Sequence, residues 1–177
     1  MNKKKLKVIG GILAFALCFP LHFLYEKFPN FITSIFAPVN ESIWEHMKII
    51  FGSIILSGVI QKIIVLIKKE EIKNICFSNF VAALAALPIY LIIYLPLFHI
   101  IGESMFLAIS IMLITIVISQ VISYKIMNKN DLKLETITIF LVIVVYIIFT
   151  ILTYNPIESD LFIDPKTGIY GTNEKND

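Results

Sequence analysis

Long apolar segments alternate with short polar ones along nearly the whole chain. Five segments have about the 20 apolar residues that a membrane-crossing helix needs. They cover residues 6–25, 49–67, 75–98, 104–125 and 136–154. A helix satisfies all of its backbone polar groups inside a bilayer, so the pattern predicts an all-α integral membrane protein with five transmembrane helices.

A shorter sixth helix is predicted between the first two spans. Its apolar positions recur at helical spacing, at Phe28, Phe31, Ile32, Ile35 and Phe36. Polar side chains lie opposite them, and the segment 28–37 is too short to cross a membrane. We therefore expect an amphipathic helix in the membrane interface. Residues 1–154 then form a single helical membrane domain, followed by a tail over 155–177.

Composition supports a membrane protein and argues against nucleic-acid binding. Hydrophobic residues make up 58% of the 177 positions, and the mean hydropathy is +0.85, whereas soluble domains are about 45–50% apolar. The net charge is only +2, and no DNA- or RNA-binding motif is present. The expected partner is the lipid bilayer, with a membrane-protein partner or a second copy of the chain left open.

The lysines are distributed unevenly about the predicted spans, and the sequence contains no arginine. With a cytoplasmic N-terminus, eleven lysines lie on the cytoplasmic side and four on the other. Such an excess is typical of cytoplasmic loops. The pattern predicts a multi-pass protein of the cell membrane with a cytoplasmic N-terminus and an extracytoplasmic C-terminus. All three histidines then lie toward the outside.

The run Pro38-Val39-Asn40-Glu41-Ser42-Ile43-Trp44-Glu45-His46-Met47-Lys48 places ionisable side chains beside the second predicted span. Such groups cost free energy next to hydrocarbon unless they are paired or hydrated, so they tend to mark function. Part of the run has a structural interpretation. Asn40 as N-cap with Glu41 in the first turn suits a helix start, and Ser42-Ile43-Trp44-Glu45 also fits a capping box. Trp44 suits the interfacial aromatic belt.

A helix through this run would place Glu41, Glu45 and Lys48 on one face. His46 would then lie about 100° from Glu45, on the face that packs against other helices. Helix capping does not explain why His46 lies on the packing face. His22 lies at the outer end of the packing face of the first span, so we expect the two histidines to be close together. Any catalysis here would use His46 as a general base, with Glu41 or Glu45 as its acid partner.

Histidine–carboxylate groupings suggest a metal site. Two histidines have a carboxylate four residues further on: His22 with Glu26, and His99 with Glu103. Such a carboxylate could orient the imidazole, or the two could simply form an interfacial ion pair. Zinc commonly takes three protein ligands in catalytic sites. The expected set is His22, Glu45 and His46, although the spacing matches no established zinc motif.

The tail adds a predicted turn and further candidate ligands. Asp164-Pro165-Lys166-Thr167-Gly168 is strong turn sequence between two short apolar pairs. It predicts a hairpin or flap that covers the site or rests on the membrane. The main candidate ligand-binding residues of the chain are His22, Glu26, Asn40, Glu41, Glu45 and His46. The additional candidates are Trp44, His99, Glu103, Asp160 and Asp164.

Small and polar residues also follow single faces of the spans. We favour the interpretation that these residues let the helices pack closely against one another. The alternative is a hydrated path through the bundle, lined by Ser53, Ser57, Gln61, Thr115 and Ser119.

The run over residues 38–48 resembles the signature of a family of small multi-span bacterial membrane proteins, mainly from Firmicutes and of unknown function. The resemblance extends over the whole chain, including His22 and the acidic tail with Phe162 and Asp164. It supports the membrane assignment and the choice of motif, and it implies no activity.

Three functional classes follow from these observations. The first, which we favour, is a membrane protein that binds a small ligand or cation at an outward-facing His/Glu site, as a transporter or an accessory subunit. The second is a membrane-embedded enzyme, with or without a metal, acting on lipid or an envelope precursor. The third is a structural or partner-binding protein whose motif caps and orients helices. No specific signal decides whether the chain is an enzyme.

Overall fold

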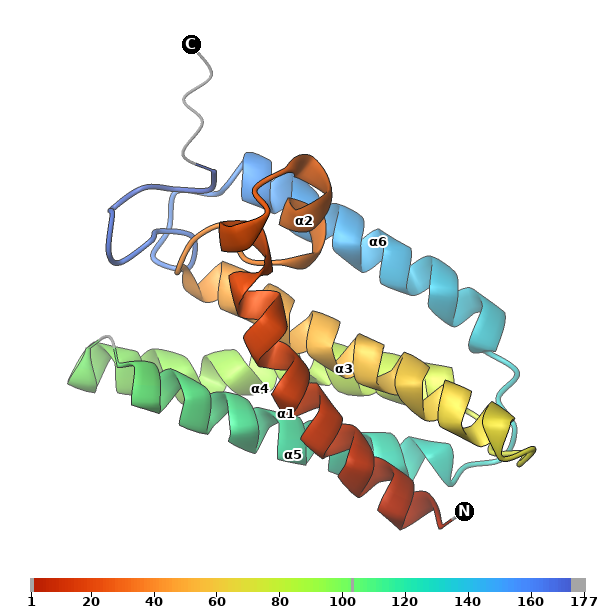
Figure 1. Ribbon diagram of the computed structural model, residues 1–177. Helices are drawn as coiled ribbons and strands as arrows, with labels where there is room; N and C mark the ends of the chain where they lie inside the picture. The colour runs from red at the N-terminus through yellow and green to blue at the C-terminus, as the bar shows by residue number, and fades with distance from the viewer. Residues whose placement is uncertain (1, 103, 173–177) are drawn as a thin grey trace.

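The computed structural model describes residues 2–102 and 104–172 and is all-helical (Figure 1). Its six helices are α1 (Lys3–Lys27), α2 (Phe31–Phe36), α3 (Ile43–Ile67), α4 (Ile75–Ile101), α5 (Met105–Met127) and α6 (Glu135–Tyr154). Within the described residues there is no strand, only an isolated antiparallel bridge between Ile163 and Tyr170. All helices except α2 are long and apolar enough to cross a membrane.

Each predicted span corresponds to one of these five helices, and the predicted short helix corresponds to α2. The largest difference is the start of α3, six residues before the predicted span. Ser42 is the N-cap, and its hydroxyl accepts a hydrogen bond from the Glu45 amide at 3.3 Å. The prediction that Asn40 caps this helix, with Glu41 in its first turn, is therefore wrong. Glu41 precedes the helix and does not share a helix face with Glu45.

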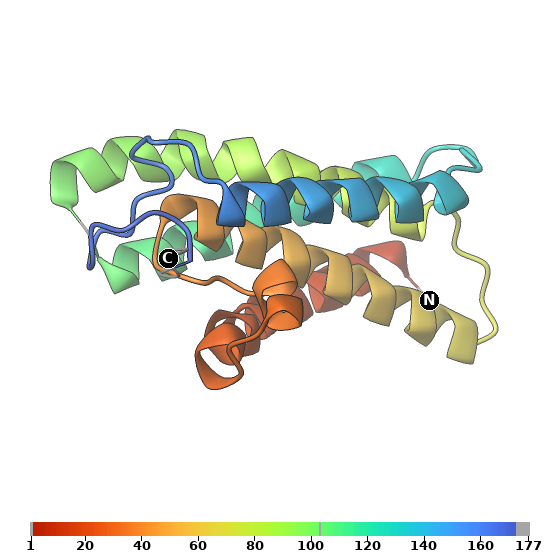
Figure 2. The same cartoon turned by 90° about the horizontal axis from the view of Figure 1, so that it is seen from above.

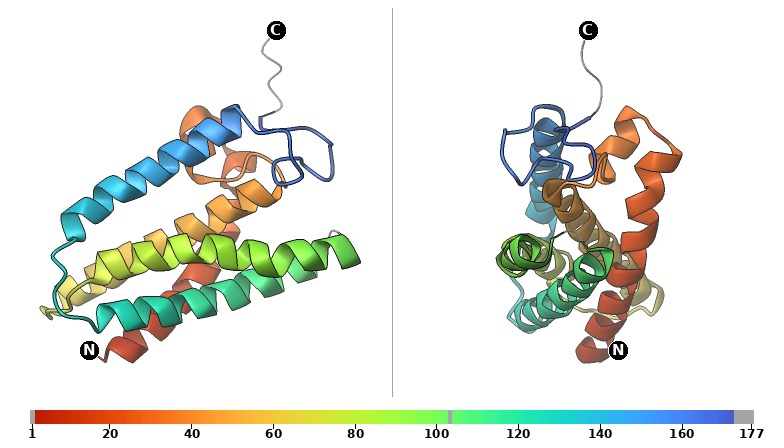
Figure 3. Two further views of the ribbon diagram at one scale, coloured as in Figure 1. Left: turned by 180° about the vertical axis from the view of Figure 1, so that it is seen from behind. Right: turned by 90° about the vertical axis from the view of Figure 1, so that its left-hand side faces the viewer.

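The five long helices run alternately up and down between two ends of the bundle (Figures 1 and 3). One end, the tail end, carries α2, the turn between α4 and α5, and the tail that follows α6. The opposite end carries the start of α1 and the connections over 68–74 and 128–134. Short connections between long apolar helices favour this arrangement, since neighbouring helices then pack antiparallel.

The core of the bundle is centred on α3. The end-on view in Figure 3 shows α3 near the middle, with α1, α4, α5 and α6 around it. Over its most apolar stretch, 56% of α3 is buried, against 17% of α6. Seen from above, α6 lies over α3 and α4 (Figure 2), where Tyr146 and Phe149 contact Phe51. The other side of α6 exposes a row of large apolar side chains.

A buried lysine ties three helices together away from the tail. Lys7 of α1 is 4% exposed, and its ammonium donates to Gln61 Oε1 at 2.9 Å and to Asn79 Oδ1 at 3.1 Å. Nearby, the Ser57 hydroxyl donates to the Gly10 carbonyl at 2.7 Å. A Cβ atom on Gly10 would overlap the Gln61 side chain. At this end of the bundle the small and polar residues thus serve close helix packing.

Candidate functional site

A pocket of about 630 Å³ lies at the tail end of the bundle. Its walls come from α1, the start of α3, the end of α4, the start of α5 and the tail. Most of the wall is apolar. Its histidine, acidic and lysine lining residues are His22, Glu26, Glu41, His46, His99, Asp160 and Lys166.

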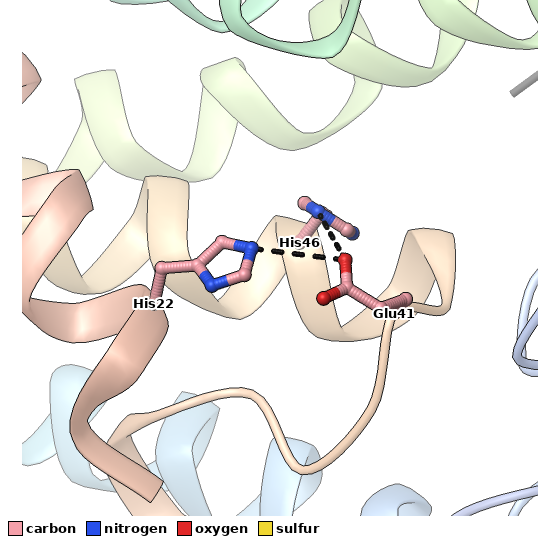
Figure 4. Close-up of side chains that lie close together, drawn as sticks. All are labelled: His22, Glu41 and His46. Atoms are coloured by element: carbon pink, nitrogen blue, oxygen red, sulfur yellow. Dashed lines mark ion pairs between the residues drawn. The ribbon is translucent and has the colours of Figure 1, made fainter. Parts of the chain in front are cut away.

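His22, Glu41 and His46 converge at one side of this pocket (Figure 4). Glu41 Oε2 lies 3.7 Å from His22 Nε2 and 3.6 Å from His46 Nε2. The two imidazole rings have centroids 5.7 Å apart, which confirms the predicted proximity of the histidines. Their common acidic neighbour is Glu41, from the connection directly before α3. One ligand atom from each residue lies within 4.8 Å of the others.

Hydrogen bonding fixes the tautomer of His46. Its Nδ1 lies 3.0 Å from the Ser42 carbonyl oxygen, which can only accept, so the proton is on Nδ1. In a neutral ring, Nε2 is then an acceptor facing the Glu41 carboxylate, which also only accepts. Two acceptors in that position need a cation between them, either a proton or a metal ion. A proton would make the ring an imidazolium paired with Glu41, and a metal ion would bind both groups directly.

His22 has one ring nitrogen without a hydrogen-bond partner among the described residues. That atom is Nδ1, which is buried, while Nε2 faces Glu41. Buried polar atoms are seldom left unsatisfied.

The surroundings of Glu41 keep its carboxyl group ionised. The polar contact with His22, together with the nearby imidazole of His46 and ammonium of Lys166, lowers the pKa of Glu41 to about 2, although partial burial opposes the shift. The Lys166 ammonium lies 3.5 Å from Oε1, whereas both histidines face Oε2. One carboxylate oxygen thus faces the tail and the other faces the histidines.

Glu45 belongs to a different, fully buried network. It is 1% exposed, and its Oε2 lies 2.6 Å from the Lys48 ammonium. Its carboxylate also accepts from the Val39 amide at 3.1 Å and the Thr153 hydroxyl at 2.6 Å. Lys48 donates in turn to the Ser34 carbonyl at 2.9 Å. This network joins α2, α3 and α6, and the structure groups the two histidines with Glu41 instead of Glu45.

Asn40 and Trp44 hold the tail in place. The Asn40 side-chain amide donates to the Gly171 carbonyl at 2.9 Å. The Trp44 backbone amide donates to the Leu161 carbonyl at 2.8 Å, and its ring stacks on Phe162 with centroids 4.9 Å apart. These two residues thus determine where the tail lies over the pocket.

Of the other candidate residues, Glu26, His99 and Asp160 line the pocket but are not part of the His22–Glu41–His46 cluster. The His99 ring contacts the Leu95 carbonyl of its own helix, with Nδ1 at 2.7 Å. Glu103, its predicted partner, lies outside the described residues. Glu26, His99 and Asp160 thus share the pocket with the cluster without joining it.

Lys166 is the site residue that the sequence did not single out. Asp164, which was a candidate ligand, is buried in the predicted turn and accepts from the Lys166 amide at 2.8 Å. Gly168 has φ +70°, a conformation that favours glycine. The turn carries Lys166 over the pocket. The sequence feature that could have pointed to Lys166 is this turn, which is predicted as a hairpin or flap. The sequence does not show which side chain of the turn contacts the site.

The family described as "Family of unknown function (DUF6512)" matches residues 1–172. The chain belongs to this family. Five long apolar helices agree with a multi-span membrane protein. No curated protein and no solved structure matches the chain.

Proposed function

We propose that this member of the DUF6512 family is a multi-pass membrane protein that binds a divalent transition metal ion, zinc in the first instance. The ligands are His22, Glu41 and His46, and the tail end faces outward from the cell. The observation that carries the proposal is the convergence of three ligand atoms within 4.8 Å. Glu41 replaces Glu45 in the ligand set expected from the sequence.

The distances from Glu41 to the two imidazoles suit a small metal ion. Ligand atoms about 2.1 Å from a tetrahedral zinc ion lie about 3.4 Å from one another. The two imidazole nitrogens lie 3.6 and 3.7 Å from Glu41 Oε2. The contact of His46 Nδ1 with the Ser42 carbonyl provides the outer hydrogen bond that orients a metal-binding imidazole.

Three protein ligands leave a fourth position open toward the pocket, an arrangement typical of catalytic zinc sites. A membrane-embedded, metal-dependent enzyme is therefore the second candidate function. In both candidates the metal ion is held by the same three residues, so metal binding is the first property to test.

The test is elemental analysis of detergent-solubilised protein purified without chelator and equilibrated with zinc. We expect near one equivalent in the wild type and a loss of metal in His22→Ala/His46→Ala. His99→Ala is the matched control, since His99 lines the same pocket outside the cluster, and it should retain the metal. Wild-type protein without metal, or a double variant that still binds it, would refute the proposal.

The proposed orientation is tested separately by labelling intact cells with a membrane-impermeant maleimide. Thr167→Cys in the exposed turn should react, whereas Lys129→Cys at the opposite end should react only after permeabilisation. Both variants are made in a chain in which Cys18 and Cys76 are replaced by serine. The reverse pattern would mean that the tail end faces the cytoplasm.

A further inference from the structure

We propose that the pocket beside the metal site holds one acyl chain of an aminophospholipid, with the headgroup among His22, Glu41, His46 and Lys166. The proposal rests on the proposed function only where it invokes the metal ion. The pocket and Lys166, which lines it, do not depend on a bound metal. It identifies the class of ligand that the pocket would bind. It also gives a role to Glu26 and Asp160, the two pocket carboxylates outside the His22–Glu41–His46 cluster.

The pocket walls suit a hydrocarbon chain. Its apolar lining comes from three helices and includes Phe15 and Phe19 of α1, Leu95 of α4, and Met105 and Met112 of α5. The volume of about 630 Å³ is within the range of about 300–1,000 Å³ typical of ligand sites. Apolar walls do not hold ordered water, because buried water needs two to four polar partners. An apolar ligand is therefore the natural occupant.

The pocket also communicates with the surface of the bundle. Phe19, Phe23 and Met105 line it, yet they remain 44%, 46% and 78% exposed. All three lie on helices proposed to cross the bilayer, near the ends that meet the headgroup region. A chain from the adjacent leaflet could enter there without leaving an apolar environment.

Charges at the polar side of the pocket favour a headgroup with both signs. The Lys166 ammonium attracts a phosphate oxygen, and a metal ion held by His22, Glu41 and His46 would add to that attraction. Glu26 and Asp160 also line the pocket and favour a cationic group. A headgroup with a phosphate and a primary amine carries both of these charges. A purely anionic or an uncharged headgroup would leave one set of charges unmatched.

The test measures lipid retained by the zinc-loaded protein after exchange into detergent with phosphatidylethanolamine, phosphatidylglycerol or diacylglycerol. We expect about one phosphatidylethanolamine per chain, several-fold less phosphatidylglycerol and least diacylglycerol. Ala108→Trp, which fills the pocket from α5, should abolish retention. Val117→Trp is the matched control, because Val117 lies on the same helix, is 55% exposed and does not line the pocket.

Two further variants test the headgroup. Lys166→Gln should lower phosphatidylethanolamine retention several-fold, while Lys129→Gln at the opposite end should not change it. Glu26→Gln/Asp160→Asn should remove the preference over phosphatidylglycerol. Equal retention by Ala108→Trp and the wild type, or equal retention of diacylglycerol, would overturn the proposal.

Elemental analysis of the same samples separates the two proposals. Bound zinc without retained phospholipid would overturn the lipid proposal alone. Retained phospholipid in protein that never binds metal would support the lipid proposal and refute the proposed function.

Discussion

Glu41 and Glu45 lie four residues apart in the sequence, on either side of the residue that caps α3, and they occupy opposite kinds of environment. The Glu45 carboxylate is surrounded by Lys48, Thr153 and a backbone amide in a fully buried network. The Glu41 carboxylate is 29% exposed and lies at a pocket wall beside two histidines. The first carboxylate joins helices, whereas the second leaves room for a ligand.

The surroundings of Glu41 and Glu45 differ in how completely their polar groups are hydrogen-bonded or ion-paired. At Glu45 each charge has its partner within hydrogen-bonding distance, so a ligand has nothing to add. At Glu41 the histidine nitrogens lie beyond 3.5 Å from the carboxylate, and one buried imidazole nitrogen has no partner within the described part of the chain. Buried polar groups are normally satisfied. This incompletely satisfied cluster beside a pocket is the reason that we propose a binding site at Glu41, whereas the complete network at Glu45 is structural.

The largest predicted effect follows from breaking the buried pair. Glu45→Gln leaves the Lys48 ammonium without its counter-ion and should cost about 3–5 kcal/mol of stability. Thermal unfolding in detergent, followed by circular dichroism, measures the loss. Glu41→Gln is the matched control and should destabilise much less. If the two variants unfold at the same temperature, the distinction between the two carboxylates is wrong.

The next effect concerns the docking of the tail. Phe162 is 6% exposed and stacks on Trp44, so Phe162→Ala should weaken tail docking by about 3 kcal/mol. Trypsin should then cleave after Lys166 much faster than in the wild type. Ile169→Ala, at a residue that is 43% exposed, serves as control. Unchanged cleavage in Phe162→Ala would show that the Trp44 contact does not hold the tail.

A third variant tests the buried lysine at the opposite end of the bundle. Lys7→Met removes the ammonium that donates to Gln61 Oε1 and Asn79 Oδ1, and the loss of the Gln61 bond should cost about 1–3 kcal/mol. Lys5→Met, at an exposed position, should have no measurable effect. Zinc content should stay the same in both variants. A loss of zinc in Lys7→Met would mean that the two ends of the bundle are coupled.

The smallest effect is the pH dependence of Glu41. Its pKa is lowered from 4.5 to about 2, so the ionised carboxylate stabilises the fold. This contribution is complete above pH 4.5 and is lost as the pH falls through about 2. The melting-temperature difference between the wild type and Glu41→Gln should therefore shrink on acidification below pH 4.5. Glu158→Gln, at an exposed tail position, should show no such trend. A difference that grows on acidification would contradict the assignment.

The helices could be predicted because their signals are local. Apolar runs of sufficient length defined the five long helices, and the amphipathic spacing over residues 28–37 defined α2. The proximity of His22 and His46 also followed, since each was placed on the packing face of its own helix. The start of α3 was less predictable, because Asn40 and Ser42 are both good N-caps and only the folded chain selects Ser42.

The sequence by itself determined which segments are helical and which histidines meet. Tertiary structure alone decided which carboxylate joins them, because Glu41 precedes the helix and its direction follows from the connection and not from helical periodicity. It also decided that Lys166 reaches Glu41, since that contact depends on the tail docking on Trp44. Helix geometry relates residues a few positions apart, whereas contacts between distant segments arise only when the whole bundle packs.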